Sequence, residues 1–286
     1  MLIIPSPLKA LMKTSVRING VLVPGRQASV SLQRYCRPVC FFNPGSPYEI
    51  SAAGSCFLFK YRSRCLAFFT KHQLGKTSEA RAPGEFCIII DDKETGGKVA
   101  ITPNEATGIT YNKVEYRFAE DVQFVQYQAD RDGRDLSRYF VDIDLEGLAD
   151  LRAVSQNQLV AIFSIGYPSA WTSYDFDLDD DWAPRDMEVT HRFGKLIFAN
   201  GWTEGMEFHL TLRQHPNYPE TIADLDGFSG SPVFFFYKDA SLQVHLGFAG
   251  MIRLGGNGIV HVYEAAHVKK ILDQGFPRAA PKSTAA

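Results

Sequence analysis

The stretch Asp226-Gly227-Phe228-Ser229-Gly230-Ser231-Pro232-Val233 runs directly into the apolar residues Phe234-Phe235-Phe236-Tyr237. A serine between glycines, followed by a proline and a buried strand, fits a nucleophile loop, because glycine lets backbone N–H groups approach a reacting carbonyl. The same composition is typical of a β-turn that enters a strand. Whether Ser229 is a nucleophile or part of a simple turn therefore depends on whether the chain also supplies a base and an orienting carboxylate.

Length and charge limit the classes of protein to which this chain can belong. Its 286 residues can bury a full core, as one large all-β domain or as two smaller domains. The net charge of -2, from 30 basic and 32 acidic side chains, predicts neither a nucleic-acid partner nor a membrane surface. No apolar run approaches the roughly 20 residues of a membrane span, and the N-terminus does not read as a secretory signal.

The cysteines favour a reducing compartment. They are five in number and lie in the first third of the chain: Cys36, Cys40, Cys56, Cys65 and Cys87. An odd number cannot pair completely, and the Cys36-x3-Cys40 pair has no second Cys or His pair at zinc spacing downstream. We therefore expect reduced thiols, a cytoplasmic protein, and neither a metal nor an organic cofactor.

The apolar pattern predicts an all-β chain with one C-terminal helix. We interpret residues 1–45 as an N-terminal appendage that contains a short hairpin around Asn19-Gly20, a strong two-residue turn signal. After it come about a dozen short apolar runs separated by turns, as expected for strands. An amphipathic helix is predicted over residues 264–274, and residues 276–286 form a Pro/Ala/Ser tail that we expect to be disordered.

Two polar residues stand at strand ends upstream of the serine. His72 follows the run Cys65-Leu66-Ala67-Phe68-Phe69-Thr70, where a rigid strand can project it into a cleft, although a surface histidine that closes a strand is the simpler interpretation. Asp121 directly precedes Val122, and a carboxylate there can accept a hydrogen bond from an imidazole N–H. Base, acid and nucleophile candidates thus follow one another along the chain.

One strongly acidic block, residues 175–181, could be interpreted as a cation-binding site. Its alternate carboxylates are similar to the start of a calcium loop, but such loops need glycine at the sixth position, where Asp180 stands. A solvated loop is the favoured interpretation.

The three candidates and their neighbours resemble the chymotrypsin-like (trypsin-like) serine peptidases, including the bacterial trypsin-like and HtrA-type branches. Four places carry the resemblance in the family's order: Gly54-Ser55-Cys56-Phe57-Leu58-Phe59 leading to Phe69-Thr70-Lys71-His72; Asp121-Val122-Gln123-Phe124-Val125; Ile165-Gly166-Tyr167-Pro168; and Gly227-Phe228-Ser229-Gly230-Ser231-Pro232-Val233. They cover about residues 50 to 275. Phe228 departs from the aspartate of many secreted members, so activation by N-terminal cleavage is not expected, and Lys71-His72-Gln73 lacks the family's cysteine after the histidine.

The resemblance implies two six-stranded antiparallel β-barrels with a C-terminal helix. The first barrel, residues 46–150, would carry His72 and Asp121, and the second, residues 151–275, would carry Ser229. The implied chemistry is peptide hydrolysis by a Ser-His-Asp triad through an acyl-enzyme, with the N–H groups of Gly227 and Ser229 as the oxyanion hole.

The resemblance also implies a substrate site, with Ala223 near the base of the first side-chain pocket. Gly250, Met251 and Ile252 would form the wall that pairs with the substrate. An uncharged pocket base predicts a preference for small or medium apolar residues, whereas a shift in the count would bring in Asp224 and favour basic ones.

Three alternatives stay open at the level of sequence. Asp142 or Asp144 could be the acid in place of Asp121, which is preferred because its neighbours match. The domain could be catalytically silent and bind a peptide or partner protein through the same cleft, since a fold does not guarantee its chemistry. A structural β-barrel protein with accidental motifs is the third and weakest interpretation. The expected partners are a protein or peptide substrate and an unidentified regulatory protein.

Overall fold

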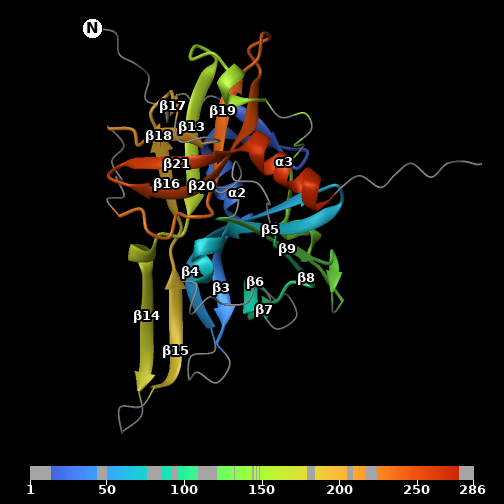
Figure 1. Cartoon of the computed structure of the whole chain (residues 1–286), viewed down its shortest axis with the longest axis vertical. Helices are drawn as coiled ribbons and strands as arrows, with labels where there is room; N and C mark the ends of the chain where they lie inside the picture. The colour runs from blue at the N-terminus through green and yellow to red at the C-terminus, as the bar shows by residue number, and fades with distance from the viewer. Residues whose placement is uncertain are drawn as a thin grey trace, which may run out of the picture.

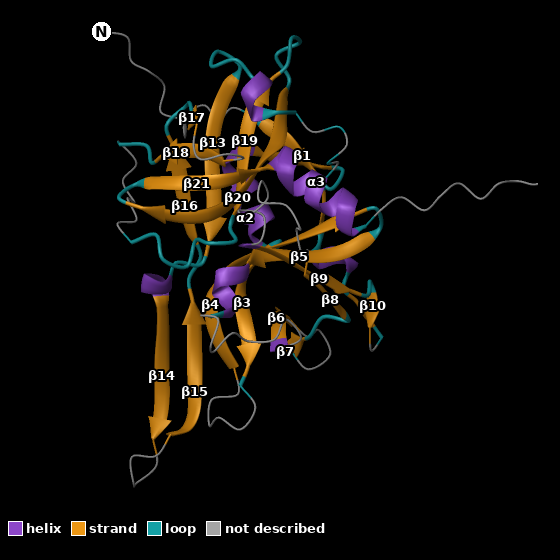
Figure 2. Ribbon diagram, viewed as in Figure 1, coloured by secondary structure: helices purple, strands orange, loops and turns teal. Residues whose placement is uncertain are grey.

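Strands dominate the protein, as Figure 2 shows. The computed structural model describes residues 14–43, 50–75, 85–91, 96–108, 121–131, 133–143, 145, 147, 149–178, 184–204, 209–216 and 224–276. No helix in these ranges is long and apolar enough to cross a membrane. Most of the described strands belong to two large sheets, one in each half of the chain (Figure 1).

The first sheet has eight strands, in the order β7-β6-β3-β4-β5-β9-β8, with β12 added in parallel to β4. Its strands are β3 (Cys36–Phe42), β4 (Ile50–Tyr61), β5 (Arg64–Thr70), β6 (Phe86–Asp91), β7 (Lys98–Ile101), β8 (Glu105–Gly108), β9 (Val122–Tyr127) and β12 (Val141–Asp142). Arg62 and Ser63 connect β4 to β5 with positive φ at both positions, the two-residue geometry that matches the twist of a hairpin.

The second sheet has seven strands, in the order β16-β13-β19-β20-β21-β18-β17. Its strands are β13 (Leu159–Gly166), β16 (Gly194–Phe198), β17 (Thr203–Glu204), β18 (His209–Arg213), β19 (Pro232–Lys238), β20 (Val244–Gly256) and β21 (Ile259–Glu264). A bridge between Phe198 and Gln214 brings the end of β16 against the end of β18. The sheet therefore curls back toward its own edge.

Smaller elements complete the fold. They are β1 (Ser15–Ile18), β2 (Val21–Pro24), α2 (Gly25–Gln33), η1 (Lys71–Leu74), β10 (Asp130–Arg131), β11 (Arg134–Asp135), η4 (Ser137–Tyr139), η5 (Leu151–Ala153), η6 (Ser169–Trp171), β14 (Thr172–Leu178), β15 (Pro184–His191) and α3 (Ala265–Gly275). β14 and β15 form a long ribbon that projects away from the second sheet (Figure 1).

The first sheet is buried on both faces, which explains its nearly continuous apolar runs. Successive side chains of a strand point to opposite faces. In β4, Phe57 and Phe59 enter one apolar cluster, while Cys56 and Leu58 enter a second one. Neither face is left for polar residues, so the run reads as apolar throughout.

The second sheet follows the same rule and shares one cluster with the first. In β19, Phe234 and Phe236 enter the cluster that also contains Phe57, while Phe235 enters a third cluster on the other face. The rings of Phe57 and Phe234 meet edge to face, with centroids 5.7 Å apart. The two halves of the chain are thus held together by an aromatic core.

The C-terminal helix α3 strengthens this junction. It belongs to the second half, yet its Asp273 accepts hydrogen bonds from Tyr61 and Arg62 at the β4–β5 turn. Arg62 also donates to the carbonyl oxygen of Phe276 at 2.7 Å. Helix and hairpin are therefore joined by polar contacts as well as by burial.

The structure confirms part of the predicted architecture. The fold is mostly strand with few helices, the hairpin around Asn19-Gly20 is present with positive φ at both residues, and the C-terminal helix lies within one residue of its expected bounds. Sheets of eight and seven strands are found, so two six-stranded barrels remain a prediction. Residues 277–286, expected to be disordered, lie outside the described residues.

Other predictions about the elements need correction. β3 lies inside the supposed appendage but pairs with β4 and β6, and Val16 and Leu32 are buried in the shared core. The appendage is therefore part of the body, and α2 has no counterpart among the predicted elements. The acidic block begins in strand β14 and not in a loop, although residues 179–183 lie outside the described part.

Candidate active site

His72 and Asp121 are brought together by the register of β5 and β9. These strands are antiparallel with Thr70 opposite Val122, so the residue two places after Thr70 meets the one that precedes Val122. His72 Nδ1 lies 3.0 Å from both carboxylate oxygens of Asp121, and the His72 backbone N–H donates to Oδ1 at 3.0 Å. Because a carboxylate only accepts, Nδ1 carries the proton.

Ser229 is placed by the pairing of β19 with β20. Pro232 lies opposite Met251, so the turn before Pro232 faces the residues after Met251. The N–H of Gly230 donates to the carbonyl of Ile252 at 2.8 Å, and the Ser229 hydroxyl donates to the carbonyl of Arg253 at 3.0 Å. The loop is thus fastened along β20.

Two side chains of the first half connect the histidine to the serine loop. Gln73, next to His72 in η1, donates from Nε2 to the carbonyl oxygens of Ala53, Ser55 and Ser229 at 2.9, 3.1 and 2.9 Å. The Ser55 hydroxyl donates to the carbonyl of Gly227 at 2.7 Å. Base and nucleophile loop therefore share one hydrogen-bonded frame across the junction of the two sheets.

Glycine is required at two positions of the serine loop. Gly227 has φ +87°, and a Cβ there would lie 2.4 Å from the carbonyl oxygen of Tyr167. Gly230 has φ +84°, and a Cβ there would lie 2.0 Å from the carbonyl oxygen of Ser55. Within the described part of the chain, the N–H groups of Gly227 and Ser229 have no hydrogen-bond acceptor, so both are available to a ligand oxygen.

The imidazole keeps its second nitrogen available. Thr70 Oγ1 lies 3.3 Å from His72 Nε2, but it donates its one proton to Gln73 Oε1 at 2.9 Å. The orientation of this amide is set by the carbonyls around its Nε2 and by the Thr70 N–H, which donates to Oε1 at 2.8 Å. Nε2 therefore retains its lone pair, as a general base requires.

The serine hydroxyl rests away from this base. It donates to the Arg253 carbonyl, and no hydrogen bond joins it to His72 among the described residues. Catalytic hydrogen bonds are often long or absent before substrate binds, so this resting geometry is compatible with a triad. It is equally compatible with a cleft that only binds.

Arg253 contacts the acid as well as the nucleophile. Its Nε lies 3.2 Å from Asp121 Oδ2, and both side chains are largely buried, with 18% and 16% of their surface exposed. His72 is 48% exposed. The acid is thus enclosed, while the base faces solvent.

The alternative acids do not reach His72 in the described structure. Asp142 lies in β12, paired with Lys60 of β4, and its N–H donates to Asn19 Oδ1. Asp144 lies outside the described residues. Asp121 is therefore the carboxylate that contacts the imidazole.

The expected substrate wall needs correction. Gly250, Met251 and Ile252 are bonded on one side to β19 and the residues before it, and on the other side to β21. Met251 and Ile252 are also fully buried. No strand pairs with β20 on its β19 side beyond Ile252 in the described part, so the available edge begins at Arg253.

The expected pocket base falls where the structure gives no description, because Ala223 lies outside the described residues. Asp224 is exposed, and its carboxylate accepts from the N–H of Asp226 at 2.9 Å. Leu225, buried at 4% exposure, lies within 3.0 Å of a Cβ built on Gly255.

Sequence reasoning missed Gln73 and Arg253. Gln73 reads only as a departure from the family pattern, and Arg253 is inconspicuous because it lies in an apolar strand. The available signal was a lone arginine two residues after buried Met251, where a charge needs a partner.

The cysteines are buried and unpaired, and burial raises the pKa of each thiol, that of Cys87 to about 12. Such thiols are poor nucleophiles and poor metal ligands. Among the described residues, no group of three or more His, Cys, Asp or Glu side chains is placed to hold a metal.

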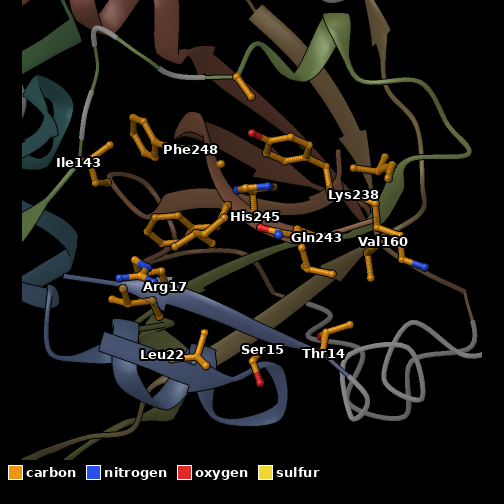
Figure 3. Close-up of a pocket in the computed structure, with 18 of the residues that line it drawn as sticks. Thr14, Ser15, Arg17, Leu22, Ile143, Val160, Lys238, Gln243, His245 and Phe248 are labelled. Carbon is orange, nitrogen blue, oxygen red and sulfur yellow. The ribbon is translucent and has the colours of Figure 1, made fainter. Parts of the chain in front are cut away.

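A cavity of about 1180 Å³ lies elsewhere, between β1 and the β19–β20 hairpin. Figure 3 shows Arg17, Lys238 and His245 around it. His72, Asp121 and Ser229 do not line this cavity, so it is not the space in front of the serine.

No protein-family model and no curated protein sequence matches the chain. Among solved structures, the chain is similar to the protease Anisep from Arthrobacter nicotinovorans, with 12% identity over 85% of this chain and 95% of that one. The TM-score of this likeness is 0.45.

Proposed function

We propose that the protein is a serine endopeptidase of the chymotrypsin-like kind, with a β-barrel in each half and a Ser229-His72-Asp121 triad between them. The observation that carries the proposal is the shared frame of the three residues. Arg253 contacts both Asp121 and Ser229, and Gln73, adjacent to His72, holds the Ser229 carbonyl. A turn without a chemical role would not require hydrogen bonds that tie it to the neighbours of a histidine and a carboxylate.

The mechanism uses the atoms available at the site. His72 Nε2 takes the hydroxyl proton as Ser229 attacks a peptide carbonyl, and Asp121 stabilises the imidazolium that forms. The N–H groups of Gly227 and Ser229 bind the oxyanion, each worth roughly 3 kcal/mol in a comparable hydrolase. The imidazolium then protonates the leaving amine, and water repeats the sequence on the acyl-enzyme.

The substrate backbone adds to the open edge of β20. We place it along Arg253, Leu254 and Gly255, where β20 has no strand neighbour on the β19 side in the described part. Leu254 is 38% exposed, which suits contact with an apolar substrate side chain. Strand addition supplies affinity through the main chain and leaves selection to the side-chain pockets.

A silent binding domain is the second candidate. It is favoured by the resting contact of the Ser229 hydroxyl with the Arg253 carbonyl, which leaves the hydroxyl unactivated. Such a domain would bind peptides on the same strand edge without cutting them.

Labelling with a fluorophosphonate separates the two candidates. We expect wild-type protein to be labelled at Ser229, Ser229→Ala to be unlabelled, and Ser231→Ala, a change two residues away at a buried position, to remain reactive. Turnover of a peptide library by Ser229→Ala should fall by roughly a millionfold, as in a convergent protease. Folded wild-type protein that resists the reagent while a known serine peptidase reacts would reject catalysis.

A further inference from the structure

We propose that Arg253 is a positioning residue for the triad, which orients Asp121 from the second sheet. This rests on the proposed function. A backbone irregularity in β20 points to this role. Ile252 lies opposite Val262 and Leu254 lies opposite His261, so Arg253 is the extra residue of a β-bulge. Bulges beside active sites re-aim a side chain.

The bulge directs the guanidinium of Arg253 across the junction of the two sheets. Arg253 Nε reaches Asp121 Oδ2 at 3.2 Å, and its guanidinium carbon lies 6.0 Å from the centre of the Tyr263 ring. The side chains of Arg253 and Asp121 are both largely buried, so solvent and salt screen this ion pair weakly. Such a pair fixes geometry even where its net contribution to stability is small.

The same carboxylate oxygen serves two groups. Oδ2 is 3.0 Å from His72 Nδ1 and 3.2 Å from Arg253 Nε, while Oδ1 accepts the His72 backbone N–H. With three N–H donors, the carboxylate cannot rotate without loss of a contact. Arg253 thereby holds the hydrogen-bonding direction that keeps the proton of His72 on Nδ1.

Among the described residues, the side chains that contact the Asp121 carboxylate are His72 from η1 and Arg253 from β20. The Tyr263 ring of β21 lies beside the guanidinium. Arg253 is therefore the side chain through which the second sheet reaches the acid.

The test is the rate of Ser229 labelling by a fluorophosphonate, measured on full-length folded protein. Arg253→Met should react roughly tenfold more slowly, because the carboxylate is no longer held. Arg253→Lys should recover part of the rate but not all of it, because an ammonium restores a donor to Asp121 and lacks the planar geometry of guanidinium.

The matched control is Arg152→Met. Arg152 forms ion pairs with Glu264 and Glu204 in the same half of the chain, and neither partner belongs to the triad. It should lower stability and leave the labelling rate of the folded protein unchanged. Arg253→Met with the wild-type rate would overturn the proposal. So would a loss of rate that Arg253→Lys does not relieve.

Two further outcomes also decide the role of Arg253. If Arg253→Met does not fold, Arg253→Gln and Arg253→Lys are compared, and wild-type labelling rates in both reject the positioning role. If wild-type Ser229 is not labelled, the proposed function fails. The Nδ1 proton signal of His72 in NMR then tests Arg253 alone: this signal should change its chemical shift in Arg253→Met, and an unchanged signal rejects the inference.

Discussion

Gln73 connects four residues of the site through hydrogen bonds of its side-chain amide. Its amide is buried and contacts Thr70, Ala53, Ser55 and Ser229. Through Thr70 it keeps a competing proton away from His72 Nε2, and through the Ser229 carbonyl it holds the nucleophile loop. One residue thus serves the base and the nucleophile without taking part in proton transfer.

Replacement of Gln73 by Leu should therefore cost both stability and reactivity. We expect a loss of about 1–3 kcal/mol in the free energy of unfolding, because buried carbonyls and the Thr70 N–H lose their partner. Urea unfolding measures this loss, and fluorophosphonate labelling should slow in the same variant. Gln126→Leu is the control, because Gln126 contacts Arg64 at an exposed position, and its effect should stay within about 0.5 kcal/mol. Equal stability of the two variants would contradict this role.

Among single residues, the sequence identifies the site residues that a local pattern marks. It misses the residues whose contacts arise only from tertiary pairing. His72, Asp121 and Ser229 each mark a strand end or a turn, so they can be read locally. The structure pairs His72 with Asp121 directly and links the Ser229 loop to them through Gln73 and Arg253. Gln73 and Arg253 acquire their contacts from residues far along the chain and from a bulge, neither of which leaves a periodic signal.

Among the elements, the end of β13 sets the position of the nucleophile loop. Gly166 lies beneath the loop, where a Cβ would come within 2.1 Å of Ser231 Oγ and 2.8 Å of the Phe228 ring. Phe228 is fully buried in the core of the second sheet. An aromatic side chain therefore anchors this loop from within.

Gly166→Ala should displace the loop. Rotation of Ser231 can move its Oγ, but the fully buried Phe228 ring has no room to withdraw, so we expect overpacking to cost about 1–3 kcal/mol. Labelling of Ser229 should fall more than stability, because the loop moves relative to His72. The control is Gly256→Ala, since a Cβ there meets nothing within 4 Å. Wild-type labelling by Gly166→Ala would show that the loop tolerates the extra carbon.

The elements that were mispredicted share a cause. α2 contains Ser, Val and Gly and has a weak helical pattern, but Ala28 and Leu32 are buried against the shared core, so packing decides its conformation. In the β14–β15 ribbon, Asp175 lies opposite Glu188, a like-charge pair that disfavours a strand interpretation. In α2 and in the β14–β15 ribbon, packing and pairing partners that the sequence does not reveal outweigh local propensity.

The whole molecule assembles the site from two sheets, and the site should be lost when they separate. In a urea titration followed by labelling rate and by far-ultraviolet circular dichroism, the labelling midpoint should lie at or below the midpoint for the strands. Undocking breaks the contacts of Gln73 and Arg253 with the opposite half before or together with the strands themselves. Labelling that persists above the strand midpoint would contradict an active site built across the junction.

The junction also sets when the proposed activity can arise. His72 and Asp121 flank strands of the first sheet, whereas Ser229 and Arg253 come with the second, more than one hundred residues further along. A chain still emerging from the ribosome thus carries His72 and Asp121 before it carries the serine that they would activate. In the proposed peptidase, cleavage can begin only when the second sheet has folded onto the first.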